Sequence, residues 1–342
     1  MKHLKLSSAI AAAAISLLGS TSAMSATVLN VYTALETDQL KAYQEAFNKV
    51  HPDIEIKWTR DSTGIITAKI LAEKAKPVAD VIMGVAATSM GAFDREGMLA
   101  PYAPKNLKEI NPMYVAKGKT PAWIGMDVWG ATVCYNTVEA EKQKLPKIES
   151  WKDLTKPEFK GKSVMPNPNS AGTGFLDVTA WLQMFGEKEG WNYMEALHQN
   201  VAVYTHSGSK PCVMAGSGEF PVGISFEYRA NTMIEKGAPI QAIFPKEGLG
   251  WDVEAVGIVK TTPKMDAAKK LVDWATSRQA NELYAKNFAI VAIPGIATGL
   301  KHVPADYEKR LVKNDFAWIG KNRDAILKEW DKRFSVKSEP KK

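Results

Sequence analysis

Three short stretches combine hydroxyl side chains with glycine at points where a helical pattern begins. They are residues 61–64 (Asp-Ser-Thr-Gly), 169–174 (Asn-Ser-Ala-Gly-Thr-Gly) and 206–209 (His-Ser-Gly-Ser). The first amides of a helix lack partners inside the helix and carry the positive end of its dipole, so small residues there let an oxyanion approach bare N–H groups. The same residue types also cap helices without any ligand. Three such turns in one chain favour a phosphate or phosphonate site.

The elements that position these turns alternate between strand and helix patterns. Strand patterns at residues 28–33, 54–58 and 79–83 are separated by helical patterns at residues 40–50 and 66–71. This order predicts parallel strands joined by crossover helices, an α/β fold whose ligand sites lie at the carboxyl ends of the strands. The later chain repeats the scheme, with strands expected at residues 164–165, 201–204, 222–226, 241–244 and 255–259, and helices at residues 228–236, 265–287 and 315–334.

The N-terminus has the features of a secretory signal peptide. Two lysines precede a continuous apolar stretch at residues 6–18, and small residues follow it up to Ala26. The apolar stretch is too short to span a bilayer, and cleavage after Ala23 or Ala26 fits the small-residue rule. We therefore expect residues 1–26 to be removed and the mature protein to work in the periplasm.

Length and charge narrow the class of protein. A chain of 342 residues, of which 45% are hydrophobic, exceeds what one core usually holds and favours two lobes. The formal charge of +7 falls to +5 when the two leader lysines are removed, and several remaining lysines gather in residues 328–342. No arginine-rich stripe or aromatic-basic pattern accompanies them, so we expect a solvated basic face and no nucleic-acid partner.

Two cysteines, Cys134 and Cys212, can form a disulfide or serve as small core residues. Both remain after removal of the leader, and an oxidising compartment permits them to pair. Cys134 lies in an apolar strand pattern and Cys212 in a helical one, which also suits unpaired core positions. The sequence does not supply the Cα separation that decides between the two.

Five segments together carry a family resemblance. They are residues 31–36 (Val-Tyr-Thr-Ala-Leu-Glu), 58–69 (Trp-Thr-Arg-Asp-Ser-Thr-Gly-Ile-Ile-Thr-Ala-Lys), 79–81 (Ala-Asp-Val), 167–176 and 209–227. With the signal peptide, they resemble periplasmic solute-binding proteins of ABC importers. More narrowly, the chain resembles the 2-aminoethylphosphonate-binding branch, whose members are relatives of the ferric-ion binders.

The resemblance implies a type II periplasmic-binding fold, in which two α/β lobes joined by a hinge close on a ligand in the cleft between them. One lobe is expected to hold residues 27–128 and 250–299. The other is expected to hold residues 129–249 and 300–342, with the C-terminal helices packed on it or across the hinge. Such a protein binds a small molecule without a cofactor, passes it to the membrane permease of an ABC transporter, and works as a monomer.

2-Aminoethylphosphonate is a zwitterion at neutral pH, so its site needs donors at one end and a carboxylate or an aromatic face at the other. Hydroxyls and helix-start amides suit the phosphonate without a counter-charge. The expected phosphonate contacts come from both lobes, with Ser62, Thr63 and Gly64 from one and Ser170, Gly172 and Thr173 from the other. Ser207 and Ser209 are expected as a third contribution, with helix capping as the alternative.

Glu36 is the expected partner of the ammonium group. It follows the first strand where the resembling iron binders carry a metal-ligating histidine, which implies a place in the cleft. The alternative is an acidic first helical turn, where a carboxylate favours the helix dipole. Glu227 and Tyr228 stand where iron binders carry adjacent tyrosines, and Tyr228 offers a hydroxyl or a cation-facing ring. Either of these two residues can instead cap or pack the helix that begins there.

A ferric-ion site is the first alternative function. Residues 226–229 read Phe-Glu-Tyr-Arg and lack the tyrosine pair of ferric-ion binders, and Val85 stands near the position of their metal carboxylate. Both departures argue against iron, although Glu36, Glu227 and Tyr228 offer an oxygen ligand set. We expect no metal site.

A secreted phosphonate or phosphoester hydrolase is the second alternative. The histidines after the leader are His51, His198, His206 and His302, and none has zinc-ligand spacing or adjoins a Gly-x-Ser-x-Gly elbow. His206, beside Ser207, is the one histidine in a candidate turn and would act as a base. A polar strand end explains it as well, so we expect a binding protein rather than an enzyme, with no catalytic residue.

Overall fold

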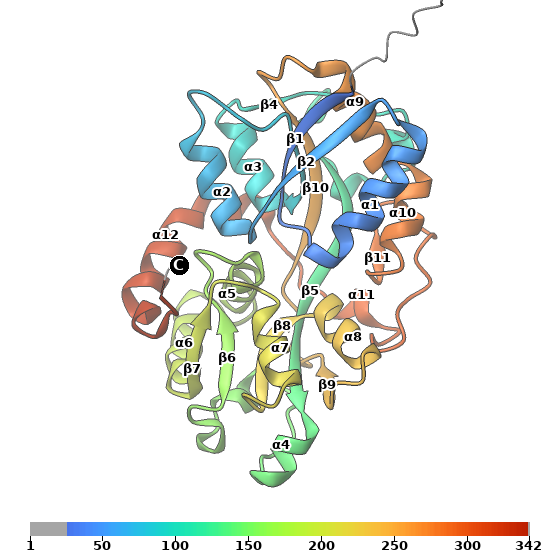
Figure 1. Cartoon of the computed structure of the whole chain (residues 1–342). Helices are drawn as coiled ribbons and strands as arrows, with labels where there is room; N and C mark the ends of the chain where they lie inside the picture. Colours follow the sequence, from blue (N-terminus) through green and yellow to red (C-terminus); the bar gives the residue numbers. More distant parts are fainter. Residues whose placement is uncertain (1–25, 341–342) are drawn as a thin grey trace, which may run out of the picture.

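A computed structural model describes residues 26–340 of the chain, so the expected signal peptide lies almost entirely outside the described residues. In that part of the chain, no helix is both long and apolar enough to cross a membrane. Figure 1 shows two lobes, one above the other, each with strands at its centre and helices around them.

The first lobe, at the top of Figure 1, is built around parallel strands joined by crossover helices. Its third strand is buried along its whole length, as expected for a strand covered on both faces. Its first helix turns Tyr43 and Phe47, which are four residues apart, toward the core. The elements are β1 (Thr27–Thr33), α1 (Thr37–Val50), β2 (Ile54–Arg60), α2 (Thr63–Ala72) and β3 (Val81–Ala86), with β1 paired in parallel to both β2 and β3.

Two further stretches, distant in sequence, complete the first lobe. A single helix expected at residues 265–287 is interrupted, because Ser277 Oγ accepts a hydrogen bond from the N–H of Ala280 (3.2 Å) and starts a new helix. The elements after β3 are α3 (Ala87–Arg95), β4 (Leu99–Ala100), η1 (Leu107–Glu109) and η2 (Pro112–Tyr114). Those of the returning stretch are β10 (Trp251–Val259), antiparallel to β3, then α9 (Met265–Ala275), α10 (Arg278–Tyr284) and β11 (Ile290–Val291).

The second lobe has its own parallel core. Strand β6 (Ser163–Pro166) is parallel to both β7 (Val201–Thr205) and β8 (Val222–Phe226). Helices connect these strands in the order that the sequence predicts. The remaining elements are α4 (Thr137–Lys142), η3 (Trp151–Thr155), η4 (Pro157–Phe159), α5 (Gly172–Phe185), α6 (Glu187–Asn200), α7 (Lys210–Gly216), α8 (Glu227–Glu235) and β9 (Ile240–Ile243).

One strand, β5 (Ile124–Asn136), runs through both lobes. The main strand order is β2-β1-β3-β10-β5-β8-β6-β7, with β4 paired to β10, and β9 and β11 paired to β5. It pairs with β10 in the first lobe, and with β8 and β9 in the second. Its change of partner falls at Gly130. A Cβ on Gly130 would lie 2.3 Å from the hydroxyl of Tyr307, and one on Gly250 would lie 2.5 Å from the carbonyl oxygen of Leu176. Glycine therefore permits the close packing at the crossing.

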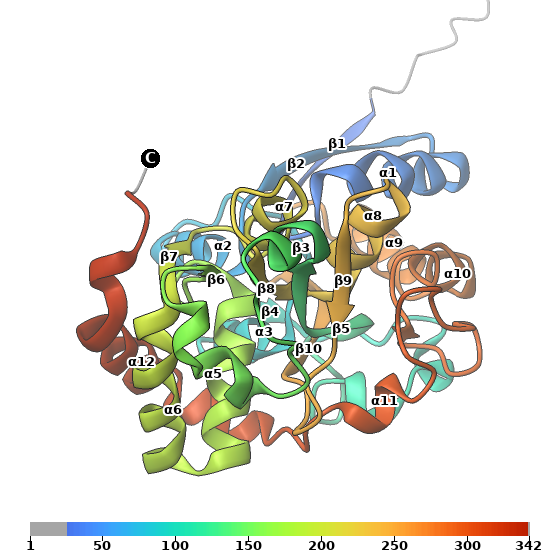
Figure 2. The same cartoon turned by 90° about the horizontal axis from the view of Figure 1, so that it is seen from below.

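The last long helix touches both lobes. The chain ends with α11 (Tyr307–Arg310), α12 (Phe316–Phe334) and η5 (Ser335–Lys337). Near the start of α12, the Gly320 carbonyl accepts a hydrogen bond from Arg95 of α3 (3.2 Å), and near its end Trp330 packs edge-to-face on Tyr204 of β7. Figure 2 shows α12 beside β7 and α6. This helix therefore lies across the boundary between the lobes.

The structure pairs the two cysteines. Cys134 of β5 and Cys212 of α7 form a disulfide, with their Cα atoms 5.3 Å apart and a sequence separation of 78. Closing a loop of that length restricts the unfolded chain by about 4 kcal/mol in the chain-entropy account. The bond ties α7 to the strand that crosses between the lobes.

Candidate functional site

A cavity lies between the lobes, where the chain leaves β1 and β2 and where α2 and α5 begin. Figure 1 shows the start of α2 facing α5 across the gap. The cavity volume is about 40 Å³, room for a few water molecules, so the lobes have closed on it. Its walls are Ala34, Glu36, Arg60, Ser62, Thr63 and Glu254 from the first lobe, Trp129 from the crossing strand, and Ala171, Gly172, Thr173, Gly208 and Phe226 from the second.

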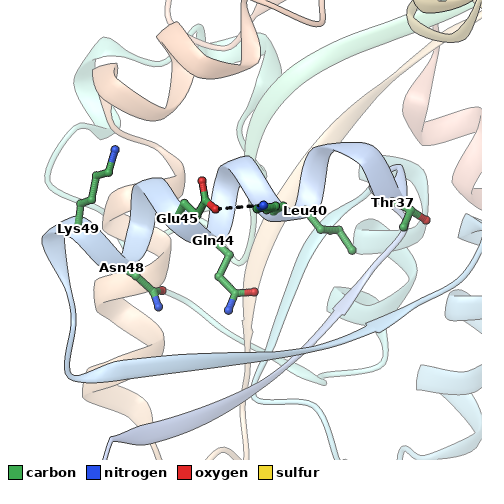
Figure 3. A pocket seen from close by; sticks show the side chains of 7 residues that line it. Thr37, Leu40, Gln44, Glu45, Asn48 and Lys49 are labelled. Atoms are coloured by element: carbon green, nitrogen blue, oxygen red, sulfur yellow. Dashed lines mark ion pairs between the residues drawn. The ribbon is translucent and has the colours of Figure 1, made fainter.

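A larger hollow lies on the outer face of α1 (Figure 3). Lys41 and Glu45 form an ion pair there, with 3.8 Å between the ammonium nitrogen and the carboxylate oxygen. Every residue that lines this hollow belongs to α1, so groups from separate elements do not converge on it. The cavity between the lobes is the better candidate.

The lobes touch directly at the start of α2. The N–H of Gly64 donates to the carbonyl oxygen of Ser170 (2.9 Å), and a Cβ on Gly64 would lie 2.2 Å from the carbonyl oxygen of Asn169. Gly64 is therefore required for the close approach of the two backbones. In this arrangement the other lobe occupies the N–H of Gly64, and the expected contact of this N–H with the phosphonate stays a prediction.

Two threonines reach the cavity from opposite lobes. Thr63 begins α2, and Thr173 lies in the first turn of α5. Glycines make room for both hydroxyls. A Cβ on Gly172 would lie 2.8 Å from Thr63 Oγ1, and one on Gly208 would lie 2.5 Å from Thr173 Oγ1. The structure thus brings Ser62, Thr63, Gly172 and Thr173 together at the cavity, next to helix-start amides that have no intrahelical partner.

The other predicted hydroxyls lie behind the cavity wall. Ser170 Oγ is 3.0 Å from His206 Nδ1, and Ser207 Oγ accepts from the N–H of Ser209 (3.3 Å). Ser209 Oγ donates to Glu36 Oε1. Ser170, Ser207 and Ser209 therefore hold the surrounding loops and do not line the cavity. Ser209 precedes α7 without capping it through its side chain, so the capping alternative is wrong as well.

Glu36 lines the cavity, but its carboxylate already has cationic partners. Oε2 lies 3.3 Å from a guanidinium nitrogen of Arg60 and 3.0 Å from one of Arg229. The N–H of Glu36 donates to the side chain of Gln39 at the start of α1 (2.9 Å), which matches the helix-start alternative. Two guanidinium groups neutralise this carboxylate, so its expected role as the free ammonium partner does not fit this arrangement.

Tyr228 and Arg229 bind the first lobe instead of the cavity. The Tyr228 hydroxyl donates to Asp38 Oδ1 (3.0 Å), and Arg229 Nη1 lies 3.2 Å from Asp38 Oδ2. Burial alone would raise the pKa of Asp38, but Arg229 and the Tyr228 hydroxyl outweigh it and lower the pKa below its usual value. Burial raises the pKa of Tyr228, which stays a neutral donor. These contacts hold the lobes together.

Glu227 is fully buried at the crossing of the lobes and does not line the cavity. Its Oε2 accepts a hydrogen bond from the N–H of Gly130 (2.8 Å). Burial raises the pKa of this carboxyl to about 8, against the lowering by the Gly130 N–H and by Tyr307. In this structure the β5 backbone takes up the Glu227 carboxyl group, and the expected ammonium contact of Glu227 stays a prediction.

His206 does not have a free ring nitrogen for base catalysis. Nδ1 contacts Ser170 Oγ (3.0 Å), and Nε2 contacts the backbone oxygen of Glu339 (3.0 Å). Between residues 26 and 340, no group of three or more His, Cys, Asp and Glu side chains is placed to hold a metal ion. The oxygen set considered for iron, Glu36, Glu227 and Tyr228, is engaged in the separate contacts described above.

Seven of the cavity residues were not predicted as site residues from the sequence, and the three with a nitrogen or oxygen atom in the side chain are Arg60, Glu254 and Trp129. Arg60 ends β2, and its Nε donates to the carbonyl oxygen of Leu35 (2.9 Å), which fixes the guanidinium at the cavity. The sequence signal that could have identified Arg60 is its position directly before the hydroxyl-rich turn at residues 61–64. Glu254 and Asp252 are the two charged residues in the otherwise apolar strand β10, and charged residues inside such a strand are a signal of a site. For Trp129 of β5 the sequence carries no comparable signal.

The sequence profile of the bacterial extracellular solute-binding proteins matches residues 76–324. A Haemophilus influenzae protein, named only as uncharacterized, is 32% identical over 96% of this chain and 96% of its own length. The "Putative 2-aminoethylphosphonate-binding periplasmic protein" of Salmonella paratyphi A is 23% identical over 69% of this chain and 68% of its own length.

Solved structures share the fold. The periplasmic binding protein AfuA from Actinobacillus pleuropneumoniae, with fructose-6-phosphate bound, matches with a TM-score of 0.85 and 28% identity over 91% of this chain and 99% of AfuA. Iron-bound HitA from Pseudomonas aeruginosa matches with a TM-score of 0.74 and 18% identity, over 89% of this chain and 99% of HitA, and shows the fold alone. The expected type II periplasmic-binding fold is confirmed.

Proposed function

Since this chain belongs to the bacterial extracellular solute-binding proteins, the substrate-binding components of ABC transporters, we propose that its solute is a small organic phosphate or phosphonate. It works in the periplasm as a monomer and delivers the solute to a membrane permease. The family consists of binding proteins rather than enzymes. The ligand therefore undergoes no chemical step, and its binding free energy stabilises the closed form of the protein.

One observation carries the proposal. The first turns of α2 and α5, from opposite lobes, face one cavity with Ser62, Thr63, Gly172 and Thr173, and Arg60 lies beside them. Helix-start amides and hydroxyls donate to an oxyanion, and a guanidinium offers two parallel N–H groups to a phosphoryl group. An anion held by both turns is bound fully only when the lobes are closed, which is what a permease recognises.

Two candidate ligands, which differ in their organic part, have specific support. 2-Aminoethylphosphonate is supported by the sequence resemblance and by the similar Salmonella paratyphi A protein of that name. A sugar phosphate is supported by AfuA, whose solved structure holds fructose-6-phosphate. The side-chain contacts favour the second, because Arg60 and Arg229 already neutralise Glu36, the residue that a bound ammonium group was expected to meet.

Calorimetry of the mature, ligand-stripped protein tests the proposal. The ligands are fructose 6-phosphate, 2-aminoethylphosphonate, ethylphosphonate, inorganic phosphate and ferric citrate. We expect tight binding of at least one organic phosphate or phosphonate. Thr173→Ala should weaken it about tenfold, because a hydrogen bond to a charged group contributes about 1.5 kcal/mol or more.

Thr179→Ala is the matched control. Thr179 lies in the same helix, but its hydroxyl donates to the carbonyl oxygen of Phe175 (3.0 Å) and does not line the cavity. The ligand affinity of the Thr179→Ala variant should equal that of the wild type. Binding of ferric citrate alone, or of none of the five ligands, would overturn the proposal.

A further inference from the structure

Two acidic side chains lie together at the inner end of the cavity, and only one of them, Glu254, lines it. Glu254 of β10 lines the cavity, and Asp127 of β5 lies directly opposite it in the antiparallel pairing. Side chains of directly opposed residues point to the same face of a sheet, with Cβ atoms about 5 Å apart. The two carboxyl groups therefore lie side by side, with Glu254 at the cavity and Asp127 behind it.

Three of the four carboxyl oxygens in this pair are buried without a hydrogen-bond partner among residues 26–340. They are both oxygens of Asp127, which is fully buried, and Oε2 of Glu254. Buried polar atoms in proteins are nearly always satisfied, and leaving one unsatisfied costs about 1–3 kcal/mol. Such a pair is tolerated where a proton or an external donor meets it.

The surroundings keep a proton on the pair. Burial raises the pKa of Glu254, and the charges of Glu36 and Glu227 add to this, while interaction with the Asp127 carboxyl group and the charge of Arg60 oppose it. Burial likewise raises the pKa of Asp127, with Glu254 and Glu227 adding to it. The titratable and charged groups that face the pair are Glu36, Arg60 of β2, Tyr43 of α1, Glu227 of α8 and Tyr284 of α10.

We propose that Glu254, with Asp127 behind it, is a second subsite that recognises a hydrogen-bond-donating group, a hydroxyl or an ammonium, on the organic part of the ligand. This inference rests on the proposed function, since the phosphoryl group occupies the two helix starts. The ligand class is then a phosphate or phosphonate with a donor on its carbon chain, rather than a bare anion or a simple alkylphosphonate.

The two donors differ in what happens to the proton. A hydroxyl donates to a carboxyl oxygen of Glu254, and the pair keeps its proton. An ammonium group keeps its own three protons and forms an ion pair, so Glu254 becomes a carboxylate and its proton leaves to the solvent. Proton release on binding therefore separates the two donor types.

Three ligands of nearly equal shape test the subsite in the wild-type protein: ethylphosphonate, 2-hydroxyethylphosphonate and 2-aminoethylphosphonate. We expect at least one donor-bearing ligand to bind about tenfold or more tightly than ethylphosphonate, as for a buried acceptor that gains its hydrogen bond. Calorimetry in two buffers of different ionisation enthalpy counts protons. The expected count is close to one released with the ammonium ligand and none with the hydroxyl ligand.

Two substitutions assign the effect to Glu254. Glu254→Leu removes the acceptor and should abolish the preference for the hydroxyl and ammonium ligands over ethylphosphonate. Glu254→Gln keeps a neutral acceptor and should spare the hydroxyl ligand but weaken the ammonium ligand. Glu247→Gln is the matched control, because Glu247 accepts a hydrogen bond from the N–H of Trp151 (3.1 Å) and does not line the cavity. Thermal melts show whether each variant is folded.

The outcomes separate the subsite from the proposed function. Equal affinity of the wild type for all three phosphonates would overturn the subsite, and this comparison does not depend on any variant. If the protein binds fructose 6-phosphate but none of the phosphonates, inorganic phosphate replaces ethylphosphonate as the reference ligand without an organic part. Equal losses of affinity for fructose 6-phosphate and inorganic phosphate in a folded Glu254→Leu variant would then overturn the subsite. If no organic phosphate or phosphonate binds the wild type, the proposed function itself fails.

Discussion

The lobes meet on two sides of the cavity in different ways. On one side the contact is between backbones, with the N–H of Gly64 2.9 Å from the Ser170 carbonyl and no room for a Cβ. On the other side, Arg229 of the second lobe bridges Glu36 and Asp38 of the first. Packing contacts act over very short distances, whereas ion pairs respond to salt and pH. The backbone contact therefore limits how far the lobes close, and the ion pairs influence how firmly they stay closed.

The largest effect on ligand affinity is expected from breaking the backbone contact between Gly64 and Ser170. Gly64→Ala places a Cβ 2.2 Å from the Asn169 carbonyl oxygen, which the closed form cannot accommodate without separating the lobes. Overpacking of this kind costs about 1–3 kcal/mol, so ligand affinity measured by calorimetry should fall about tenfold to a hundredfold. Gly91→Ala is the control, since its Cβ would approach only the end of the Arg95 side chain, at 3.6 Å. Unchanged affinity in Gly64→Ala would mean that this contact does not limit closure.

The next effect comes from removing the charge on the other side. Arg229→Met leaves Asp38 without its guanidinium and Glu36 with Arg60 alone. Hydrogen bonds to charged groups contribute about 1.5–3 kcal/mol, so we expect affinity to fall about tenfold. Arg333→Met, which removes ion pairs on α12 far from the cavity, should bind as the wild type does. If both variants bind equally well, the bridge does not hold the closed form.

A smaller effect should appear as pH dependence. Because the native pKa of Asp38 is lowered, its contribution to stability is complete above the unfolded pKa, near pH 4, and is lost as pH falls through the native pKa. Asp38 is largely exposed, so solvent screening limits the contribution to about 1 kcal/mol or less. Urea unfolding of the wild type and Asp38→Asn, from about pH 3 to 7, should give free energies that differ at neutral pH and converge in acid. Parallel curves would contradict this role.

The smallest effect concerns salt. Raising the ionic strength from about 0.05 to 0.5 M should weaken ligand binding by the wild type only slightly more than binding by Arg229→Met. The Arg229 side chain is only 11% exposed, and partly buried ion pairs are screened weakly. Gly64→Ala should keep the wild-type slope of affinity against salt, because its defect is steric. Equal slopes for the wild type and Arg229→Met would assign the whole salt dependence to the ligand's own charge.

The fold was largely predictable because its signals are local. Alternating strand and helix patterns placed the parallel strands of both lobes, and hydroxyl-rich turns placed Ser62, Thr63, Gly172 and Thr173 at one cavity. The interruption of the helix at Ser277 was missed, because its apolar period continues across a residue that acts as a cap. Each of these features depends on residues within a few positions of one another in the chain.

The pairing of charged side chains could not be predicted in the same way. Glu36 has the residue type of an ammonium ligand, yet Arg229, 193 residues away in sequence, takes up its carboxylate when the lobes close. Glu227 likewise lies next to the expected site in sequence but accepts a hydrogen bond from Gly130 across the crossing. By itself, the sequence determined the two-lobed α/β architecture and the turns that start α2 and α5, because strand, helix and cap preferences are properties of short segments. Only the tertiary structure decided which polar groups remain available to a ligand, because that depends on partners brought together from opposite lobes.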